Sequence, residues 1–445
     1  MMSFAANSVQ ANAFTIQTLD GKTTIDLAGS GSILFLDYYE DLLSPCVTMI
    51  IQVMNSTSLT NVLPLRGGEK VALSLTTAFG EFAFDGDNAL YVFRISNILA
   101  DSTSERFTLH LVSRETITNE TSRCMKRYDG KINESVKKIL SEVLKTKKFK
   151  DDNIHITGNA YSFIGNMKKP FNILSWLGPK SLPTEHSNKT REVKSVGGIT
   201  KGVSGFLFYE NKEGFNFKSI DSLVSRTNSG TADSKNIPKY SYTQVIETNK
   251  PENEFKILNY GIEKNSDLIK SLRVGMYSNF TYFFNPYSQN FSVYKYNLKD
   301  EIVNANKLGT NSTIPVSEEL GTSPSRILFR TSDIGIMDND FTGKVFNDGQ
   351  QRDIADMAKS ASRYNILFTQ SLNMVVPCNI NLKVGDVIYA EFPRIERTDN
   401  KKADDEQSGL YLIKELRHHI EPGTVVTSLK LIRDSYGLYG AENIA

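Results

Sequence analysis

The sequence predicts a mainly β fold with α+β parts, in which two small antiparallel β-barrels accompany a helical segment and a mixed insertion. Short alternating apolar runs separated by turn residues occur near both ends of the chain. Between them, the apolar residues change to a helical period. The chain also holds 25 Phe and 19 Tyr beside a single Trp. Aromatic residues of this kind favour sheet surfaces and interfaces over helical bundles.

Residues 1–115 are expected to form the first barrel. Apolar and polar residues alternate over 14–19, and Asp20-Gly21 supplies a turn before the next alternating run. About eight short strands in so short a stretch are typical of a small sandwich or barrel. Further strands are expected at 33–36, 47–54, 59–65, 71–75, 81–84, 91–98 and 105–112.

Residues 116–203 are expected to form a helical, mixed domain. A helical stripe of apolar residues runs from Ile132 to Leu144, and lysines lie outside it and at its C-terminal end, where cations suit the helix dipole. Such a basic helix could contact phosphate, but a solvated lysine face is the commoner explanation. A second apolar helical run at 170–177 precedes a polar loop that extends to about residue 201.

Residues 204–220 predict a hairpin, with its turn at 211–214. The segment 223–349 mixes polar loops with aromatic, strand-like runs, and we expect it to be an irregular α+β insertion.

The segment 350–437 predicts a second small barrel. A helix is expected over 352–364, followed by antiparallel strands that continue to residue 433. The charged stretch 397–408 has the composition of a solvated loop, and 438–445 is a C-terminal tail. Two β-rich ends around a mixed middle suggest a duplicated fold.

The overall composition argues against several classes of protein, namely highly charged nucleic-acid or membrane binders, disulfide-rich proteins and zinc proteins. The 445 residues include 51 Lys and Arg against 50 Asp and Glu, so a net charge of +1 gives no overall attraction to nucleic acid or membrane. The three cysteines, Cys46, Cys124 and Cys378, are far apart and predict neither a disulfide framework nor a zinc site. The N-terminus lacks the features of a signal peptide and no run is long enough to span a membrane, so we expect a soluble protein made in a reducing cytoplasm.

Few residues suggest chemistry. His418 and His419 are adjacent on an expected strand, so they point to opposite faces and cannot easily bind one metal ion; one buried and one exposed histidine is expected. The run 338–343 resembles the start of a calcium loop, but Gly349 stands where a bidentate Glu is needed, so we expect a turn. Asp85-Gly-Asp87 is expected to be a hairpin turn. The common catalytic motifs do not occur, so we expect no catalytic, cofactor-binding or metal-binding residues and no enzymatic activity.

Three stretches carry a resemblance to a known family: Arg114–Gly130 (RETITNETSRCMKRYDG), Ser204–Asp221 (SGFLFYENKEGFNFKSID), and Ser408–His419 (SGLYLIKELRHH) with its continuation Thr427–Gly437 (TSLKLIRDSYG). Together they resemble the baseplate central hub proteins of contractile-tailed bacteriophages, in the T-even-like and cyanophage group. Such hubs are similar to the N-terminal part of type VI secretion spike proteins. These stretches are parts of strands and helices rather than catalytic signatures, so they identify a fold more securely than a mechanism.

The resemblance implies a specific assembly. Each subunit would contribute two related barrels to a homotrimeric, pseudo-sixfold ring that joins a sixfold tail tube to a threefold central spike and lines the channel for DNA. The second barrel would be discontinuous, made of 204–222 with 350–437, so that 223–349 is an insertion. Implied partners are other copies of the chain, the spike, the tube or a tube initiator, and wedge or other hub proteins, with DNA only in transit. The implied location is the virion tail baseplate, after assembly in the host cytoplasm and without membrane insertion.

Two other functions remain open from the sequence. A tail-associated glycan-binding or cell-wall-degrading protein is the main alternative, because remote carboxylate pairs cannot be recognised from sequence. Nucleic-acid binding through the lysine-flanked helix is less favoured, because charge is balanced along most of the chain.

Overall fold

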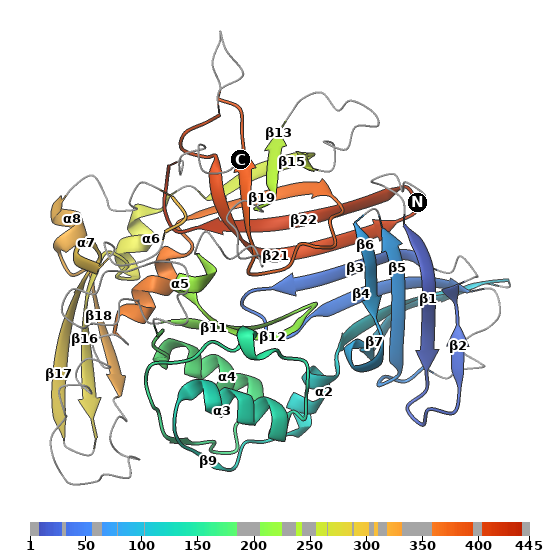
Figure 1. The fold of residues 1–445 in the computed structure, drawn as a ribbon, viewed down its shortest axis with the longest axis horizontal. Helices are drawn as coiled ribbons and strands as arrows, with labels where there is room; N and C mark the ends of the chain where they lie inside the picture. Colours follow the sequence, from blue (N-terminus) through green and yellow to red (C-terminus); the bar gives the residue numbers. More distant parts are fainter. Residues whose placement is uncertain are drawn as a thin grey trace.

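The computed structural model describes residues 9–28, 33–55, 65–77, 79–101, 103–184, 205–224, 237–242, 255–264, 266–286, 289–301, 307–309, 318–331, 358–394 and 403–437. Strands dominate it, and fifteen of them belong to one continuous hydrogen-bonded sheet. Helices gather on one side of this sheet and beyond one end of it (Figure 1). The mainly β fold class expected from the sequence is therefore confirmed.

The first set of strands follows the alternating pattern of its sequence. Phe14 and Ile16 of the first strand are fully buried while their neighbours are partly exposed, and the fifth strand, KVALSLTT, buries every second residue. The strands are β1 (Gln10–Gln17), β2 (Thr24–Asp26), β3 (Ile33–Asp41), β4 (Thr48–Asn55), β5 (Lys70–Thr77), β6 (Gly80–Phe84), β7 (Leu90–Ala100) and β8 (Glu105–Ser113). In space they run β3-β4-β8-β7-β5-β1-β2, with β6 added to β5.

The second set combines strands from two separate parts of the chain. Its members are β13 (Lys239–Tyr242), β14 (Lys256–Ile257), β15 (Asn259–Lys264), β19 (Gln370–Pro377), β20 (Val387–Glu391), β21 (Gly409–Glu421) and β22 (Thr424–Arg433). They pair in the order β15-β19-β22-β21-β20-β13-β14. Only Leu258 separates β14 from β15, and its N–H donates to Val375 of β19 at 2.8 Å. The order of strand pairing therefore begins and ends in one continuous segment, residues 256–264.

Both sets have the same strand order. If the strands of each set are numbered along the chain, leaving out β6, both sets have the same spatial order. The first set runs β3-β4-β8-β7-β5-β1-β2 and the second runs β15-β19-β22-β21-β20-β13-β14. In each set, the last strand of this order directly precedes the first strand in the sequence. One difference is that β13 pairs in parallel with β20, whereas β1 pairs antiparallel with β5. The chain thus carries one β architecture twice, as the two β-rich ends of the sequence suggested.

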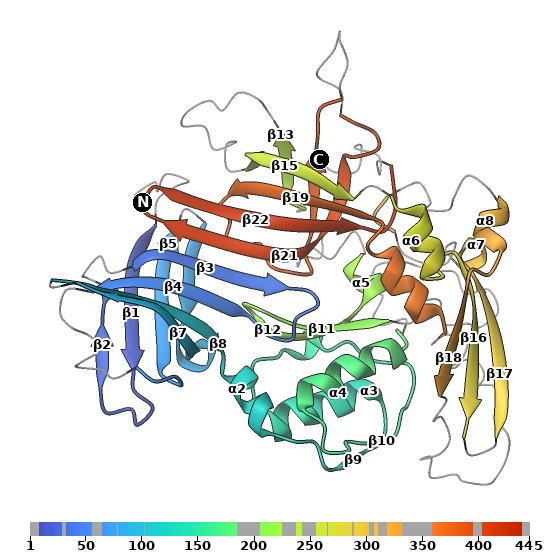
Figure 2. The same cartoon turned by 180° about the vertical axis from the view of Figure 1, so that it is seen from behind.

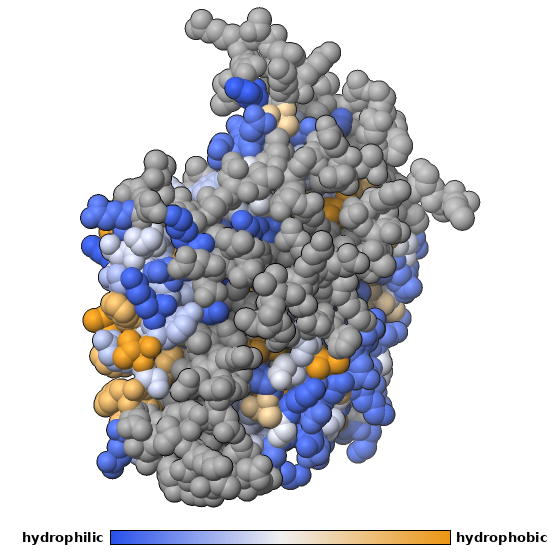
Figure 3. Space-filling view, turned by 60° about the vertical axis from the view of Figure 1, so that its left-hand side comes forward, coloured by the Kyte–Doolittle hydropathy of each residue, from blue (hydrophilic) through white to orange (hydrophobic). Residues whose placement is uncertain are grey.

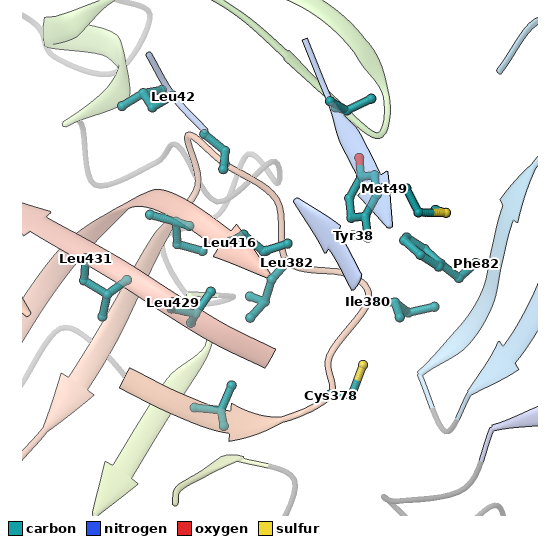
Figure 4. Close-up of a cluster of buried hydrophobic side chains, with 14 of the residues drawn as sticks. Tyr38, Leu42, Met49, Phe82, Cys378, Ile380, Leu382, Leu416, Leu429 and Leu431 are labelled. Carbon is teal, nitrogen blue, oxygen red and sulfur yellow. The ribbon is translucent and has the colours of Figure 1, made fainter. Parts of the chain in front are cut away.

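Strand β21 joins the two sets. Its first residues pair with β20, and its later residues, 415–420, pair antiparallel with β3 of the first set along the same edge. Behind this junction the loop after β19 inserts Cys378, Ile380 and Leu382 between the barrels, all buried. Figure 4 shows these side chains between Tyr38, Met49 and Phe82 on one side and Leu416, Leu429 and Leu431 on the other. A shared apolar core therefore fixes the two barrels together.

A helical unit packs below the sheet in Figure 1. It holds α2 (Arg114–Thr121), β9 (Arg127–Tyr128), α3 (Ile132–Lys138), a π-helical turn (Ile139–Val143), β10 (Phe163–Ile164) and α4 (Pro170–Leu177). The helical stripe after Ile132 and the run at 170–177 are helical as expected. Ile132, Val136, Ile139 and Leu140 are fully buried in a second apolar core.

The hairpin β11 (Phe206–Asn211) and β12 (Gly214–Ser219) lies between this unit and the barrels. Phe206 and Phe208 face the helical core, whereas Leu207 and Tyr209 face the barrel core. The expected hairpin is present. However, among the described residues its strands pair with no other strand, and Phe217 forms only an isolated bridge with Ile154. Strands β13–β15 of the expected insertion complete the second barrel instead. The hairpin is buried on both faces and contacts two cores, and the unbroken aromatic and apolar run Phe206–Tyr209 of β11 suits this position.

Most of the remaining expected insertion lies at one end of the molecule, although Leu308 is buried in the core of the barrels. The part at this end contains α6 (Leu268–Arg273), β16 (Ser278–Asn285), β17 (Asn290–Asn297), the short helices α7 (Leu298–Glu301) and α8 (Glu318–Thr322), and β18 (Arg326–Thr331). The three strands form a separate sheet in the order β17-β16-β18. Its outer face exposes Phe291, Val293, Ile327 and Phe329, and Figure 3, which brings this end forward, shows apolar residues gathered at one margin.

Several sequence expectations fall outside the described residues: the strand at 59–65 apart from its last residue, the run at 338–343, the loop at 225–236, and the first half of the helix at 352–364. The described part of that helix covers 358–366. None of the helices in the described part of the chain has the length and apolar character that crossing a membrane requires.

Candidate assembly site at the junction of the barrels

Glu40, near the end of β3, is a buried carboxyl at the junction of the two strand sets. Its side chain is 2% exposed, and it accepts hydrogen bonds from the N–H of Lys212 at 2.6 Å, the N–H of Val384 at 2.8 Å and the hydroxyl of Tyr38 at 2.8 Å. Burial raises the pKa of this carboxyl, and the three donors oppose the shift. Glu40 thus links the first barrel, the hairpin and the second barrel at one point.

Glu210 of β11 plays a comparable part between the first barrel and the helical unit. One of its oxygens, Oε2, accepts from the N–H of Val47 at 3.0 Å and from the Ser113 hydroxyl at 2.7 Å. Burial raises its pKa to about 7, although Lys148 opposes the shift. A strongly shifted carboxyl can mark a catalytic acid. The cavity beside Glu210 measures only about 10 Å³, which leaves no room for a substrate.

On the outer side of the junction, an ion pair joins β3 to β21. Asp37 receives two hydrogen bonds from Arg417, both of 2.9 Å, and its Oδ1 lies 2.7 Å from Nδ1 of His419. The Asp37 side chain is 7% exposed and that of Arg417 is 40% exposed. A forked, charge-assisted contact of this kind fixes the register of two strands as well as their distance.

Beside this ion pair, a groove of about 660 Å³ crosses five consecutive strands. Tyr39 and Thr48 line it from β3 and β4, and Arg417 and Lys430 line it from β21 and β22. The lining mixes both signs of charge with apolar groups. Two of its carboxylates, Asp41 and Glu415, both pair with Lys414, and we regard this groove as a candidate interaction surface. Its lining is Tyr39, Glu40, Asp41, Ser44, Cys46, Thr48, Asn373, Met374, Val375, Glu415, Leu416, Arg417, Ser428, Leu429 and Lys430.

The structure separates the two adjacent histidines, as their spacing predicts. His418 is fully buried, stacks on Tyr38 with ring centroids 6.0 Å apart, and lies 2.8 Å from the Thr427 hydroxyl through Nδ1. Burial lowers its pKa to about 3, so it is neutral in the fold. His419 lies on the other face, beside Asp37. Within the described ranges, no three His, Cys, Asp or Glu side chains gather closely enough to hold a metal ion.

The other sequence candidates are dispersed. Asp85-Gly-Asp87 forms a short 3-10 turn before β7, and the run at 338–343 lies outside the described residues. The lysine-flanked helix is partly neutralised within the chain, because Lys137 pairs with Asp151 and Lys148 pairs with Glu115. Sequence reasoning missed Glu40 and Asp37. The available signal was a pair of carboxylates interrupting the apolar run of β3, ILFLDYYED.

Known proteins that are similar to this chain come from phage tails and a related secretion system. No model of a protein family matches the chain. A stretch of 60 residues is 33% identical to a protein described as probable baseplate hub protein gp334 of Vibrio phage KVP40; this stretch is 14% of the chain and the chain spans only 14% of that relative. It confirms the resemblance to baseplate hub proteins inferred from the sequence.

Solved structures extend the likeness to the whole fold. A tail protein from Neisseria meningitidis MC58 superposes with a TM-score of 0.51 at 12% identity, over 95% of this chain and 96% of that one. An Escherichia coli component of the type VI secretion system covers 98% of this chain and 80% of its own length at 10% identity, with a TM-score of 0.42. The first shows a shared tail-protein fold, and the second is too distant to carry an argument.

Proposed function

We propose that this chain is the structural hub of a phage tail baseplate, a homotrimeric, pseudo-sixfold ring that joins the sixfold tail tube to the threefold central spike. The observation that carries the proposal is the repeated strand order. A chain that holds the same β architecture twice offers two equivalent surfaces, so three copies present six. A ring of this kind matches sixfold symmetry on one side and threefold symmetry on the other.

The same ring would surround the DNA channel. A channel wall with strong positive charge would bind phosphates and resist passage. The net charge of +1 is compatible with DNA passing through the channel without being held by its wall. The partners are then the spike, the tube or a tube initiator, and neighbouring wedge or hub proteins, and the ring assembles in the host cytoplasm before it becomes part of the virion.

The proposed role is mechanical rather than enzymatic. The buried carboxylates Glu40 and Glu210 receive backbone N–H donors from separate parts of the chain, which suits them to hold those parts together. We keep the division into a first barrel (1–115), a helical unit (116–203), a split second barrel (204–222 with 350–437), an insertion (223–349) and a tail (438–445) as a proposal. Within this division we assign β13–β15 of the insertion to the second barrel, because β13 pairs with β20 and β15 pairs with β19.

Native mass measurement and electron microscopy of the purified chain, alone and with the spike protein, test this proposal. We expect a particle of three chains with a central hole that binds the spike. A persistent monomer that ignores the spike would contradict it. A zymogram on peptidoglycan separates the alternative, because clearing by the purified chain would overturn the non-enzymatic role.

A further inference from the structure

We infer that neighbouring copies join by an intermolecular strand pair, in which the free edge of β7 on one copy pairs antiparallel with β15 of the next. This inference rests on the trimeric ring proposed above and names the seam of that ring. The chain itself contains the template for it, namely the pairing of β21 with β3.

The pairing of β21 with β3 starts just beyond the point where the pairing of β21 with β20 ends. Ile413 exchanges backbone hydrogen bonds with this neighbour: its N–H donates to Asp386 at 2.9 Å, and its carbonyl accepts from Gly385 at 3.1 Å. A register shift between Ile413 and Glu415 follows in the pairing with β22. Beyond the shift, the edge of β21 is free of β20 and is covered by β3.

The first barrel repeats this arrangement at β7. The N–H of Val92 donates to Glu69 at 2.9 Å, and its carbonyl accepts from Gly68 at 2.6 Å. Gly68 has φ +93°, and its counterpart Gly385 has φ +90°. A register shift between Val92 and Arg94 follows in the pairing with β8. Val92 is therefore the counterpart of Ile413, and β7 beyond Val92 is the counterpart of the segment that β3 covers.

In the described part of this chain, however, no strand covers that part of β7. Among the described residues, β7 pairs with β5 only at Leu90 and Tyr91 and with β8 along its other edge. Figure 2 shows the β7–β8 hairpin extending past the rest of the first barrel. An open strand edge of this length is a template for pairing with another chain.

The strand order identifies the partner. β3 pairs with β4, and β4 occupies the place that β19 occupies in the second barrel, so the counterpart of β3 is β15. Among the described residues, β15 pairs with β19 alone. Arg417 lies opposite Tyr39 within the chain. Following the registers from Val92 and Ile413 places their counterparts, Ser96 and Lys264 of the next copy, opposite each other.

Exposed apolar side chains accompany both free edges. Phe93, Ile98 and Leu99 on β7 are 53%, 60% and 65% exposed, and Leu258 and Ile262 beside and on β15 are 39% and 41% exposed. A long apolar edge left open in solution promotes aggregation. A second copy is the matching occupant, because every chain carries one edge of each kind. Pairing unlike edges gives a head-to-tail contact, which closes as a ring.

Cysteine cross-linking tests the register directly. We expect Ser96→Cys with Lys264→Cys in one chain to give a disulfide-linked trimer on a non-reducing gel, because opposite residues in an antiparallel pair are close enough for a disulfide. Each single variant should give no linked species, since the contact joins unlike edges. The wild-type chain controls for Cys46, which is partly exposed.

A matched pair of charge variants tests the seam by assembly. Ile98→Lys places a cation in the proposed contact and should raise the concentration for half-assembly by about tenfold or more. Ile327→Lys is the control, because Ile327 is 56% exposed, close to the 60% of Ile98, but lies on β18 away from the seam. Ile262→Lys should act like Ile98→Lys from the other edge.

The outcomes separate this inference from the proposed function. A wild-type trimer that forms no cross-link in the double cysteine variant and tolerates Ile98→Lys overturns the seam while the hub remains. A wild-type chain that stays monomeric with the spike present overturns both. Cross-linking by Ser96→Cys alone would also overturn the inference, since it would indicate a contact between two like edges.

Discussion

The Glu40 carboxylate and the N–H of Val384 are 2.8 Å apart, although 344 positions separate them in the sequence. The same carboxylate accepts the N–H of Lys212. One buried side chain therefore satisfies backbone donors from the turn of the hairpin and from the loop of the second barrel. A buried N–H without a partner costs about 1–3 kcal/mol, so the loss of this acceptor is expensive.

Glu40→Ala should lower the free energy of unfolding by about 2–5 kcal/mol, because it leaves two buried N–H groups without an acceptor. Urea denaturation followed by tryptophan fluorescence and by circular dichroism would measure the loss. Tyr38→Phe is the graded control, since it removes one donor from Glu40 and no acceptor. Equal midpoints for Glu40→Ala and Tyr38→Phe would contradict the linking role.

The contact between Asp37 and Arg417 should show a coupling of about 1–3 kcal/mol in a double-mutant cycle with alanine at both positions. Asp37 is buried and receives both prongs of the guanidinium, so its desolvated charge depends on this partner. The exposed pair Lys126–Glu142, 2.9 Å apart with side chains 71% and 50% exposed, is the control. We expect ~0–1 kcal/mol there, and a similar value for both pairs would sink the prediction.

Stability should depend on pH through Glu210. Its pKa is about 7 in the fold against an ordinary value of 4.5, so the folded chain holds this proton more tightly than the unfolded chain does. The resulting stabilisation is fully present below pH 4.5 and is lost as the pH rises to about 7.

Glu210→Gln should remove that loss, because an amide oxygen can replace Oε2 as the acceptor for Val47 and Ser113 and does not ionise. The variant should gain stability over the wild type between pH 5 and pH 8 in urea titrations at each pH. Glu142→Gln, at an exposed carboxylate, should follow the wild type. A constant difference between Glu210→Gln and the wild type across this range would argue against the shifted pKa.

Two glycines with the same backbone conformation should respond differently to alanine. Gly385 and Gly423 both have φ +90°, where a Cβ is strained, but a Cβ on Gly385 would also overlap the phenol oxygen of Tyr209, whereas Gly423 has open space. Gly423→Ala should cost about 1–2 kcal/mol from the backbone alone. Gly385→Ala should cost about 1–3 kcal/mol more. Thermal unfolding of both variants measures the difference, and equal losses would refute the steric part.

Much of the local structure follows from the sequence. The alternation in KVALSLTT and the stripe after Ile132 each specify one buried face, so the strand and the helix could be predicted where they occur. The opposite orientations of His418 and His419 follow from the same period of two. In the sequence, the duplication was visible only as two β-rich ends. Two segments can share a strand order without having the same residues at equivalent positions.

The candidate site could not be predicted in the same way. Glu40 and Asp37 are acidic residues in an apolar strand, and their role depends on donors far away in the sequence, such as Val384 and Arg417. Nothing local to β3 identifies those donors. The hairpin 204–220 was recognised, but its neighbours were not, because a strand buried on both faces fits several positions in a fold.

The sequence by itself determined which segments are strands and helices and which of their faces are buried, since side-chain period and turn chemistry act over a few residues. The tertiary structure alone decided that β21 pairs with β3, that β13–β15 complete the second barrel, and that one edge of β7 has no strand beside it among the described residues. Strand pairing uses backbone N–H and C=O groups, which every residue except proline carries. Its specificity therefore arises from the packing of the whole chain.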